Sequence, residues 1–135
     1  MLAAFRPGEE LPLTPLASLV LAFNRGAAFS FLAGEDGWQR WLFAAIAVAA
    51  CAAMAWLLRR GGSGLFCAGL ALIIGGALGN LYDRLTLGHV VDFLLVHYER
   101  WYFPAFNVAD SAITIGAAAL IIDSFRERRP VTKEH

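Results

Sequence analysis

Two aspartates stand in apolar surroundings that rarely contain ionisable residues. Asp92 lies in the stretch Val90–Leu95, and Asp110 lies near the start of the apolar run Phe106–Ile122. Ionisable groups at membrane depth are costly and usually serve a function. Two carboxylates at close range do not both ionise easily, so one keeps a proton while the other can accept a proton from water. The pair therefore suggests the acid–base chemistry of aspartic peptidases, which needs neither a metal nor a nucleophilic side chain.

The same residues also have plainer interpretations. Asp92 can be an interfacial loop residue, and Asp110 can cap the N-terminus of its helix. Asn107, Ser111 and Thr114 share a helical face with Asp110, because the spacings are three and four residues. Such a polar stripe should face the interior of a helical bundle. Spacing alone leaves both interpretations open.

A second polar cluster ends another apolar run. Asn80, Asp83 and Arg84 follow one another closely there. The acidic and basic side chains of this cluster can form an ordinary interfacial charge pair or part of a ligand site, and the sequence favours neither.

Metal and nucleic-acid binding are not expected. His89 and His97 could bind a metal together with Asp92, but no tight ligand spacing supports this. The formal net charge is zero, which gives no indication of a nucleic-acid partner.

The composition is that of an integral membrane protein. Of the 135 residues, 59% are hydrophobic and 16% are charged, whereas soluble domains carry about 25% charged residues. A single membrane domain over residues 1–135 is therefore expected. Its three predicted transmembrane helices are 41–58, 65–81 and 106–122.

Two further segments are expected outside the bilayer. Residues 16–32 alternate in hydropathy on both sides of a turn at Asn24–Gly26, which predicts a β-hairpin. Residues 82–105 are expected to form an interfacial segment because they hold an aromatic cluster. The cluster consists of Tyr98, Trp101, Tyr102 and Phe103. The sequence thus predicts an all-α membrane bundle with a small extracytoplasmic β-sheet.

The basic residues predict the orientation. Six of the eleven Lys and Arg residues fall in the loop 59–64 and the tail 123–135, which share one side if the helices alternate. The positive-inside rule makes this side cytoplasmic, so Asp92 and the start of the last helix face outward. Three helices with a cytoplasmic C-terminus leave residue 1 outside with no helix to carry it there. We therefore expect that a first helix is missing.

Four motifs follow one another along the chain. They are NRGAAFS at 24–30, GGALGNLYDR at 75–84, GHVVDF at 88–93 and FNVAD at 106–110. In this order, over residues 12–125, they strongly resemble the bacterial lipoprotein signal peptidase family, signal peptidase II. The resemblance implies an intramembrane aspartic endopeptidase of the bacterial inner membrane. Such an enzyme removes signal peptides from prolipoproteins, cutting just before the diacylglyceryl-modified cysteine.

The resemblance also implies roles for single residues. Asp92 and Asp110 would form the catalytic dyad at the periplasmic face, supported by Asp83. The implied substrate-binding residues are Asn24, Gly26, Asn80, Arg84 and Asn107. No cofactor or metal is implied. The implied partners are diacylglyceryl-modified prolipoproteins and membrane lipid, and a self-contained dyad favours a monomer.

The family fold has four transmembrane helices, a small periplasmic β-sheet and an interfacial segment. Its first helix, with an Asp and a Lys near the outer end, would precede the region matching Phe5–Pro15. A start site assigned too late is the favoured explanation for its absence. Two alternative functions for the chain stay open. One is a truncated, inactive homologue that binds lipoprotein precursors, and the other is a small proton-coupled transporter subunit.

Overall fold

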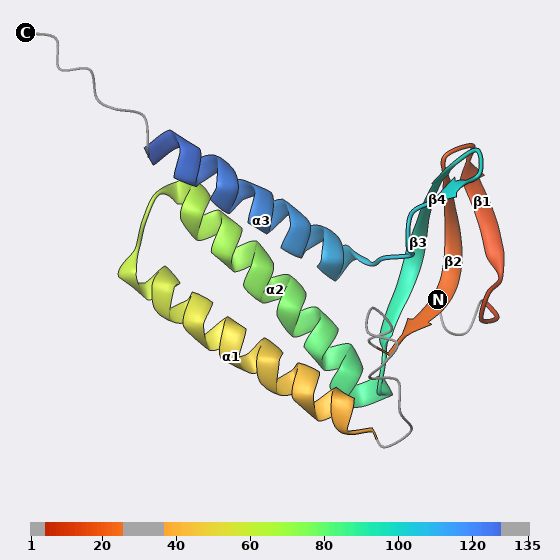
Figure 1. Cartoon of the computed structure of the whole chain (residues 1–135), viewed down its shortest axis with the longest axis horizontal. Helices are drawn as coiled ribbons and strands as arrows, with labels where there is room; N and C mark the ends of the chain where they lie inside the picture. The colour runs from red at the N-terminus through yellow and green to blue at the C-terminus, as the bar shows by residue number, and fades with distance from the viewer. Residues whose placement is uncertain (1–4, 26–36, 128–135) are drawn as a thin grey trace, which may run out of the picture.

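Three long helices lie side by side, and a small sheet sits across one end of them (Figure 1). The computed structural model describes residues 5–25 and 37–127. The helices are α1 (Trp38–Arg60), α2 (Gly64–Leu87) and α3 (Val108–Glu127). The strands are β1 (Glu10–Thr14), β2 (Ala17–Asn24), β3 (Val90–Tyr98) and β4 (Trp101–Tyr102). The prediction of an apolar helical bundle with a small sheet is confirmed.

Each of the three helices is long and apolar enough to cross a membrane. With 23 residues, α1 is about 34 Å long, which is close to the roughly 30 Å hydrocarbon thickness of a bilayer. Most of its apolar side chains are exposed, as expected for a helix that faces lipid. The second helix, α2, lies between α1 and α3 (Figure 1).

The helix ends differ from the predicted ones. The expected interfacial segment 82–105 begins with helical residues, because α2 continues to Leu87. Polar side chains from Asn80 onward end the apolar run without ending the helical backbone. The helix stops at Gly88, whose φ of +81° is the left-handed conformation typical of a C-terminal glycine. The polar cluster at Asn80–Arg84 therefore lies on a continuous helix.

The sheet is antiparallel throughout, in the order β1-β2-β3-β4. Strand β2 covers the first half of the predicted hairpin, but its partners are β1 and β3. Strand β1 was not predicted because Pro12 interrupts it; proline is tolerated there because β1 is an edge strand. The second half of the predicted hairpin lies outside the described residues.

Glycines let α2 and α3 approach closely. A Cβ at Gly69 would lie 2.9 Å from the carbonyl oxygen of Gly116, and a Cβ at Gly116 would lie 2.6 Å from that of Gly69. Only glycine fits at such a backbone contact, which is a frequent device of helix packing in membranes. At the end remote from the sheet, Ser63 caps α2 and also donates a hydrogen bond to the buried Asp123 of α3. These contacts fix α3 along α2.

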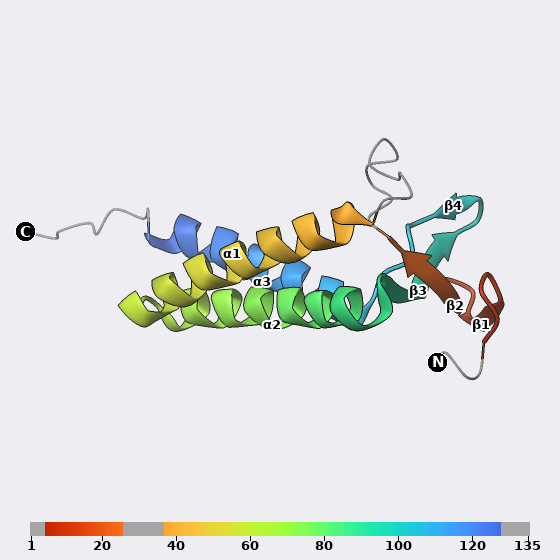
Figure 2. The ribbon, with the colours of Figure 1, turned by 90° about the horizontal axis from the view of Figure 1, so that it is seen from below.

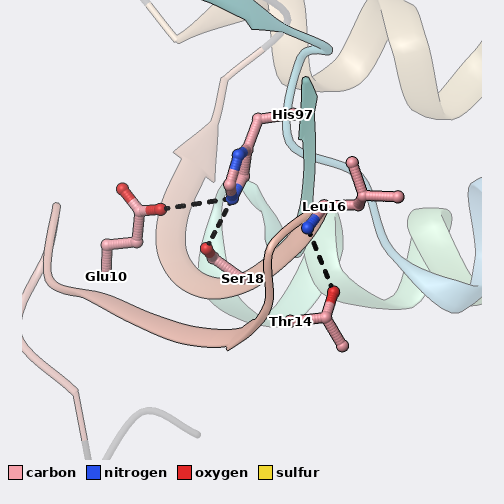
Figure 3. A network of polar contacts seen from close by, with 5 residues as sticks. All are labelled: Glu10, Thr14, Leu16, Ser18 and His97. Atoms are coloured by element: carbon pink, nitrogen blue, oxygen red, sulfur yellow. Dashed lines mark hydrogen bonds and ion pairs between the residues drawn. The ribbon is translucent and has the colours of Figure 1, made fainter. Parts of the chain in front are cut away.

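A polar cluster connects the strands at the far end of the sheet, which is the end that holds the β1–β2 and β3–β4 turns (Figure 3). Ser18 Oγ lies 3.0 Å from Nε2 of His97, and Oε1 of Glu10 lies 3.9 Å from the same nitrogen. A serine triad needs the acid on the other ring nitrogen and an accessible hydroxyl, whereas Ser18 is 0% exposed. The His97 ring also stacks on Tyr102. We interpret this cluster as a structural tie among the four strands.

Candidate active site

The return of the chain from the sheet brings the two aspartates together. Phe106 pairs with Leu94 of β3, exchanging backbone hydrogen bonds of 2.9 Å in both directions. The next residue, Asn107, therefore lies beside β3, which carries Asp92. Helix α3 begins immediately afterwards and carries Asp110 in its first turn.

Two asparagine side chains connect the aspartates. The Asn107 amide nitrogen donates hydrogen bonds to Oδ1 of Asp92 (2.9 Å) and to Oδ1 of Asn80 (3.1 Å). The Asn80 amide nitrogen in turn donates to Oδ1 of Asp110 (2.8 Å). Asn80, Asp92 and Asn107 are 8%, 3% and 5% exposed, and Asp110 is half-buried. Side chains from α2, β3 and α3 thus form one buried hydrogen-bonded chain.

Asp110 also caps its helix. The side-chain oxygen of Asn107 accepts a hydrogen bond from the Asp110 backbone N–H (2.9 Å), and Oδ2 of Asp110 accepts one from the Asn107 backbone N–H (3.2 Å). This reciprocal arrangement is a capping box with aspartate in the place of glutamate. Asp110 therefore caps its helix and is also a member of the hydrogen-bonded chain, so the two interpretations are compatible.

The predicted polar stripe on this helix is shorter than expected. The hydroxyl groups of Ser111 and Thr114 donate to the backbone carbonyl oxygens of Asn107 (3.2 Å) and Asp110 (2.9 Å). Serine and threonine often satisfy themselves in this way within a helix. Only Asn107 and Asp110 of the stripe join the polar chain.

Burial sets the protonation of Asp92. Removal from water holds its pKa above the ordinary value, and the nearby charge of Asp110 raises it further. Hydrogen bonds from Asn24 and Asn107 and the charge of Arg84 oppose this rise in the pKa. Asn24, at the end of β2, therefore belongs to the site. Gly26 lies outside the described residues.

The second polar cluster lies beside the aspartates. Asp83 Oδ2 accepts a hydrogen bond from the backbone N–H of Val91 (3.2 Å), which ties α2 to the residue before Asp92. Arg84 interacts electrostatically with Asp83, Asp92 and Asp110. Within the described segments, the Arg84 side chain has no hydrogen-bond acceptor and no carboxylate within 4.0 Å. With respect to residues 5–25 and 37–127, its donors are therefore open to a ligand.

Two residues of α1 near this site were not among the sequence candidates. The Arg84 guanidinium carbon lies 5.4 Å from the centre of the Phe43 ring, and Arg40 Nη2 donates to the Leu85 carbonyl oxygen (2.5 Å). A phenylalanine inside an apolar run gives no sequence signal for such a contact.

The two histidines considered as metal ligands make other contacts. His89 packs against Phe23 in a tilted arrangement with ring centres 4.4 Å apart, and His97 belongs to the Glu10–Ser18–His97 cluster of the sheet. Residues 5–25 and 37–127 hold no cluster of three side chains suited to a metal.

The fold combines a membrane-spanning bundle with a sheet at one end, and two linked carboxylates lie where the bundle and the sheet meet. These features define an integral membrane protein with a paired-aspartate site. A family model described as Signal peptidase (SPase) II matches residues 2–126, and the chain belongs to this family. The resemblance seen in the four motifs is confirmed, and the family does not favour the transporter alternative.

Close relatives carry the name lipoprotein signal peptidase. The protein of Ralstonia nicotianae is 58% identical over 130 residues, which are 96% of this chain and 75% of the relative. That of Pseudomonas fluorescens is 61% identical over 125 residues, 90% of this chain and 74% of the relative. A solved structure of a bacterial membrane enzyme is 27% identical, with a TM-score of 0.84 over 99% of this chain and 82% of the other.

Proposed function

We propose that this chain is an aspartic endopeptidase that removes signal peptides from bacterial prolipoproteins, cutting just before the diacylglyceryl-modified cysteine. The observation that carries the proposal is the hydrogen-bonded chain from Asp92 through Asn107 and Asn80 to Asp110. It holds two carboxylates in fixed relation at the end of a membrane bundle, as an aspartic dyad requires.

The hydrogen bonds suggest a role for each aspartate. Asp110 accepts hydrogen bonds on both carboxylate oxygens at the N-terminus of α3, which fixes the orientation of this carboxylate. Burial raises the pKa of Asp92 and so favours its protonated form. Asp110 would take a proton from water as the water oxygen bonds to the scissile carbonyl carbon, while Asp92 protonates the carbonyl oxygen. Collapse of this intermediate breaks the C–N bond. Asp110 gives its proton to the leaving amine, and a hydroxyl of the intermediate returns a proton to Asp92 as the new carboxyl group forms.

The surrounding residues would hold the substrate. The guanidinium donors of Arg84 suit a backbone carbonyl oxygen of the substrate. Asn24 makes a hydrogen bond with the carboxylate of Asp92 and so lies beside the dyad. Asn80 and Asn107 would orient the dyad and contact the scissile segment, and Gly26 is proposed as a further substrate contact from the family motif. Asp83 would support the dyad by fixing the start of β3.

The charge distribution supports a periplasmic site in the inner membrane. The α1–α2 connection and the C-terminal end of α3 lie at the end of the bundle remote from the sheet (Figure 2). Arg59, Arg60 and Arg126 lie at that end, which the positive-inside rule makes cytoplasmic. The dyad would then lie at the outer leaflet, where water can reach an unwound peptide bond. Because both aspartates belong to one chain, a monomer in contact with lipid would suffice.

Reconstitution tests the proposal. The purified chain in lipid nanodiscs would receive two matched prolipoprotein peptides, one with a diacylglyceryl-modified cysteine and one with free cysteine. We expect mass spectrometry to show cleavage only of the first, with the lipid-modified cysteine as the new N-terminus. Equal cleavage of both peptides would contradict the substrate assignment. Tight binding without cleavage would instead favour the non-cutting homologue.

A further inference from the structure

The end of α1 near the sheet contacts two consecutive residues of α2. The Phe43 ring lies against the Arg84 guanidinium, with 5.4 Å between the ring centre and Cζ. One turn earlier, Arg40 donates a 2.5 Å hydrogen bond to the carbonyl oxygen of Leu85. Because Arg40 and Phe43 are three residues apart, they lie on the same face of α1. The last turns of α2 are therefore held from α1 at two adjacent points.

Arg84 needs such support because nothing else fixes its orientation within the described residues. The charges of Asp83, Asp92 and Asp110 attract its guanidinium, but none of these carboxylates forms an ion pair with it there. A long side chain held only by distant charges keeps several rotamers. An aromatic face attracts a guanidinium and stacks flat against it, which leaves the N–H groups at the edge free.

We propose that Phe43 is a positioning residue, which holds Arg84 with its guanidinium donors toward the substrate and its charge toward the two aspartates. Arg40 assists by fixing the same turn of α2. This role rests on the proposed peptidase function, and it gives α1 a part in the site although α1 contributes no residue to the dyad.

Substitution at Phe43 separates the ring face from simple packing. Phe43→Leu keeps an apolar side chain but removes the ring, and we expect kcat/KM to fall about 2- to 30-fold. Phe43→Trp keeps a ring face and should restore kcat/KM to within about twofold of the wild type. Phe43→Met serves as a second ring-free variant should the leucine variant fold poorly. Phe125→Leu, at a ring that is 68% exposed near the other end of the bundle, is the matched control.

The pH profile distinguishes positioning from a structural role. The Arg84 charge lowers the pKa of Asp92, so a displaced guanidinium lets this pKa rise. The limb of the kcat/KM profile that Asp92 governs should move to higher pH in Phe43→Leu, but not in Phe43→Trp or Phe125→Leu.

Three results would overturn the role of Phe43. The first is wild-type kcat/KM and pH profile in Phe43→Leu. The second is equal impairment of the Leu and Trp variants, and the third is a loss of thermal stability without a shifted limb. A wild-type chain that cleaves no lipid-modified peptide would instead overturn the proposed function itself.

Discussion

The side chains of Asn107 and Asp92 are joined by a 2.9 Å hydrogen bond, although 15 residues and a change from strand to helix separate them. Asn107 uses its second amide hydrogen on Asn80, which binds Asp110. The orientation of this one amide group therefore decides how the two carboxylates lie relative to each other.

Loss of the Asn107 amide should impair both activity and folding. In Asn107→Ala the carboxylates lose their common partner, and a misplacement of about 1 Å lowers catalysis about 100-fold. Buried acceptors left without donors should lower the free energy of unfolding by about 1–3 kcal/mol. Steady-state kinetics and denaturant unfolding in detergent check both effects. Ser111→Ala removes a hydroxyl whose hydrogen bond, among the residues that the structure describes, goes to the Asn107 carbonyl oxygen. Equal activity in the two variants would contradict the role of the amide.

The buried Asp92 should make stability depend on pH. Its folded pKa is raised above the ordinary value, so the folded protein holds the proton more tightly than the unfolded chain. Stability is therefore full below the ordinary carboxyl pKa and is lost as the pH rises through the folded pKa. Each unit of difference between the folded and the unfolded pKa of Asp92 corresponds to about 1.4 kcal/mol of lost stability.

Asp92→Asn, which stays neutral, tests this dependence. Its melting temperature should exceed that of the wild type at pH 8, and the difference should shrink as the pH is lowered toward about 4. Glu99→Gln removes an exposed charge from the turn before β4 and controls for net charge. A difference between Asp92→Asn and wild type that is the same at every pH would contradict the raised pKa.

Two adjacent glycines of α2 should respond oppositely to alanine. A Cβ at Gly76 would lie 2.7 Å from Cγ1 of Ile113 and closer still to the Ala109 carbonyl oxygen, whereas a Cβ at Gly75 meets nothing within 4 Å. Gly76→Ala should destabilise the bundle by about 1–3 kcal/mol, and Gly75→Ala should be neutral or stabilise it by up to about 1 kcal/mol. Thermal unfolding in detergent measures both variants. Equal melting temperatures would show that α2 and α3 are not packed as described.

The tie at the far end of the sheet should protect its strands. Ser18→Ala leaves Nε2 of His97 without its closest partner, and a lost hydrogen bond of this kind costs about 1 kcal/mol. Faster amide hydrogen exchange is expected along β2 and the adjoining part of β3, with unchanged exchange in α2 and α3. Faster exchange in the helices alone would refute a local role.

The sequence was most informative where polar residues interrupt apolar runs. Asp92, Asp110, Asn80 and Asn107 were all visible in this way, and the structure places the four in one hydrogen-bonded chain. Their hydrogen-bond partners were not predictable, because they depend on the pairing of Phe106 with Leu94, which no local pattern encodes. The amide groups of the asparagines carry no charge, so spacing alone gave no reason to place them between the carboxylates.

Other elements were hidden because their signals are tertiary. Strand β1 contains a proline and exists because β2 pairs with it at an edge. Phe43 resembles any apolar residue of a membrane helix, and only the packing of α1 against α2 brings it to Arg84. A boundary predicted from hydropathy alone places the end of α2 too early, because the hydropathy falls at Asn80 while the backbone stays helical to Leu87.

The most direct test of the proposed dyad is cleavage of a diacylglyceryl-modified prolipoprotein peptide by wild type, Asp92→Asn and Asp110→Asn in nanodiscs, with circular dichroism to confirm folding. Both variants should keep the helical spectrum and lose cleavage by at least about 1,000-fold, because acid and base act as a unit. Cleavage at the wild-type rate by either folded variant would contradict the account.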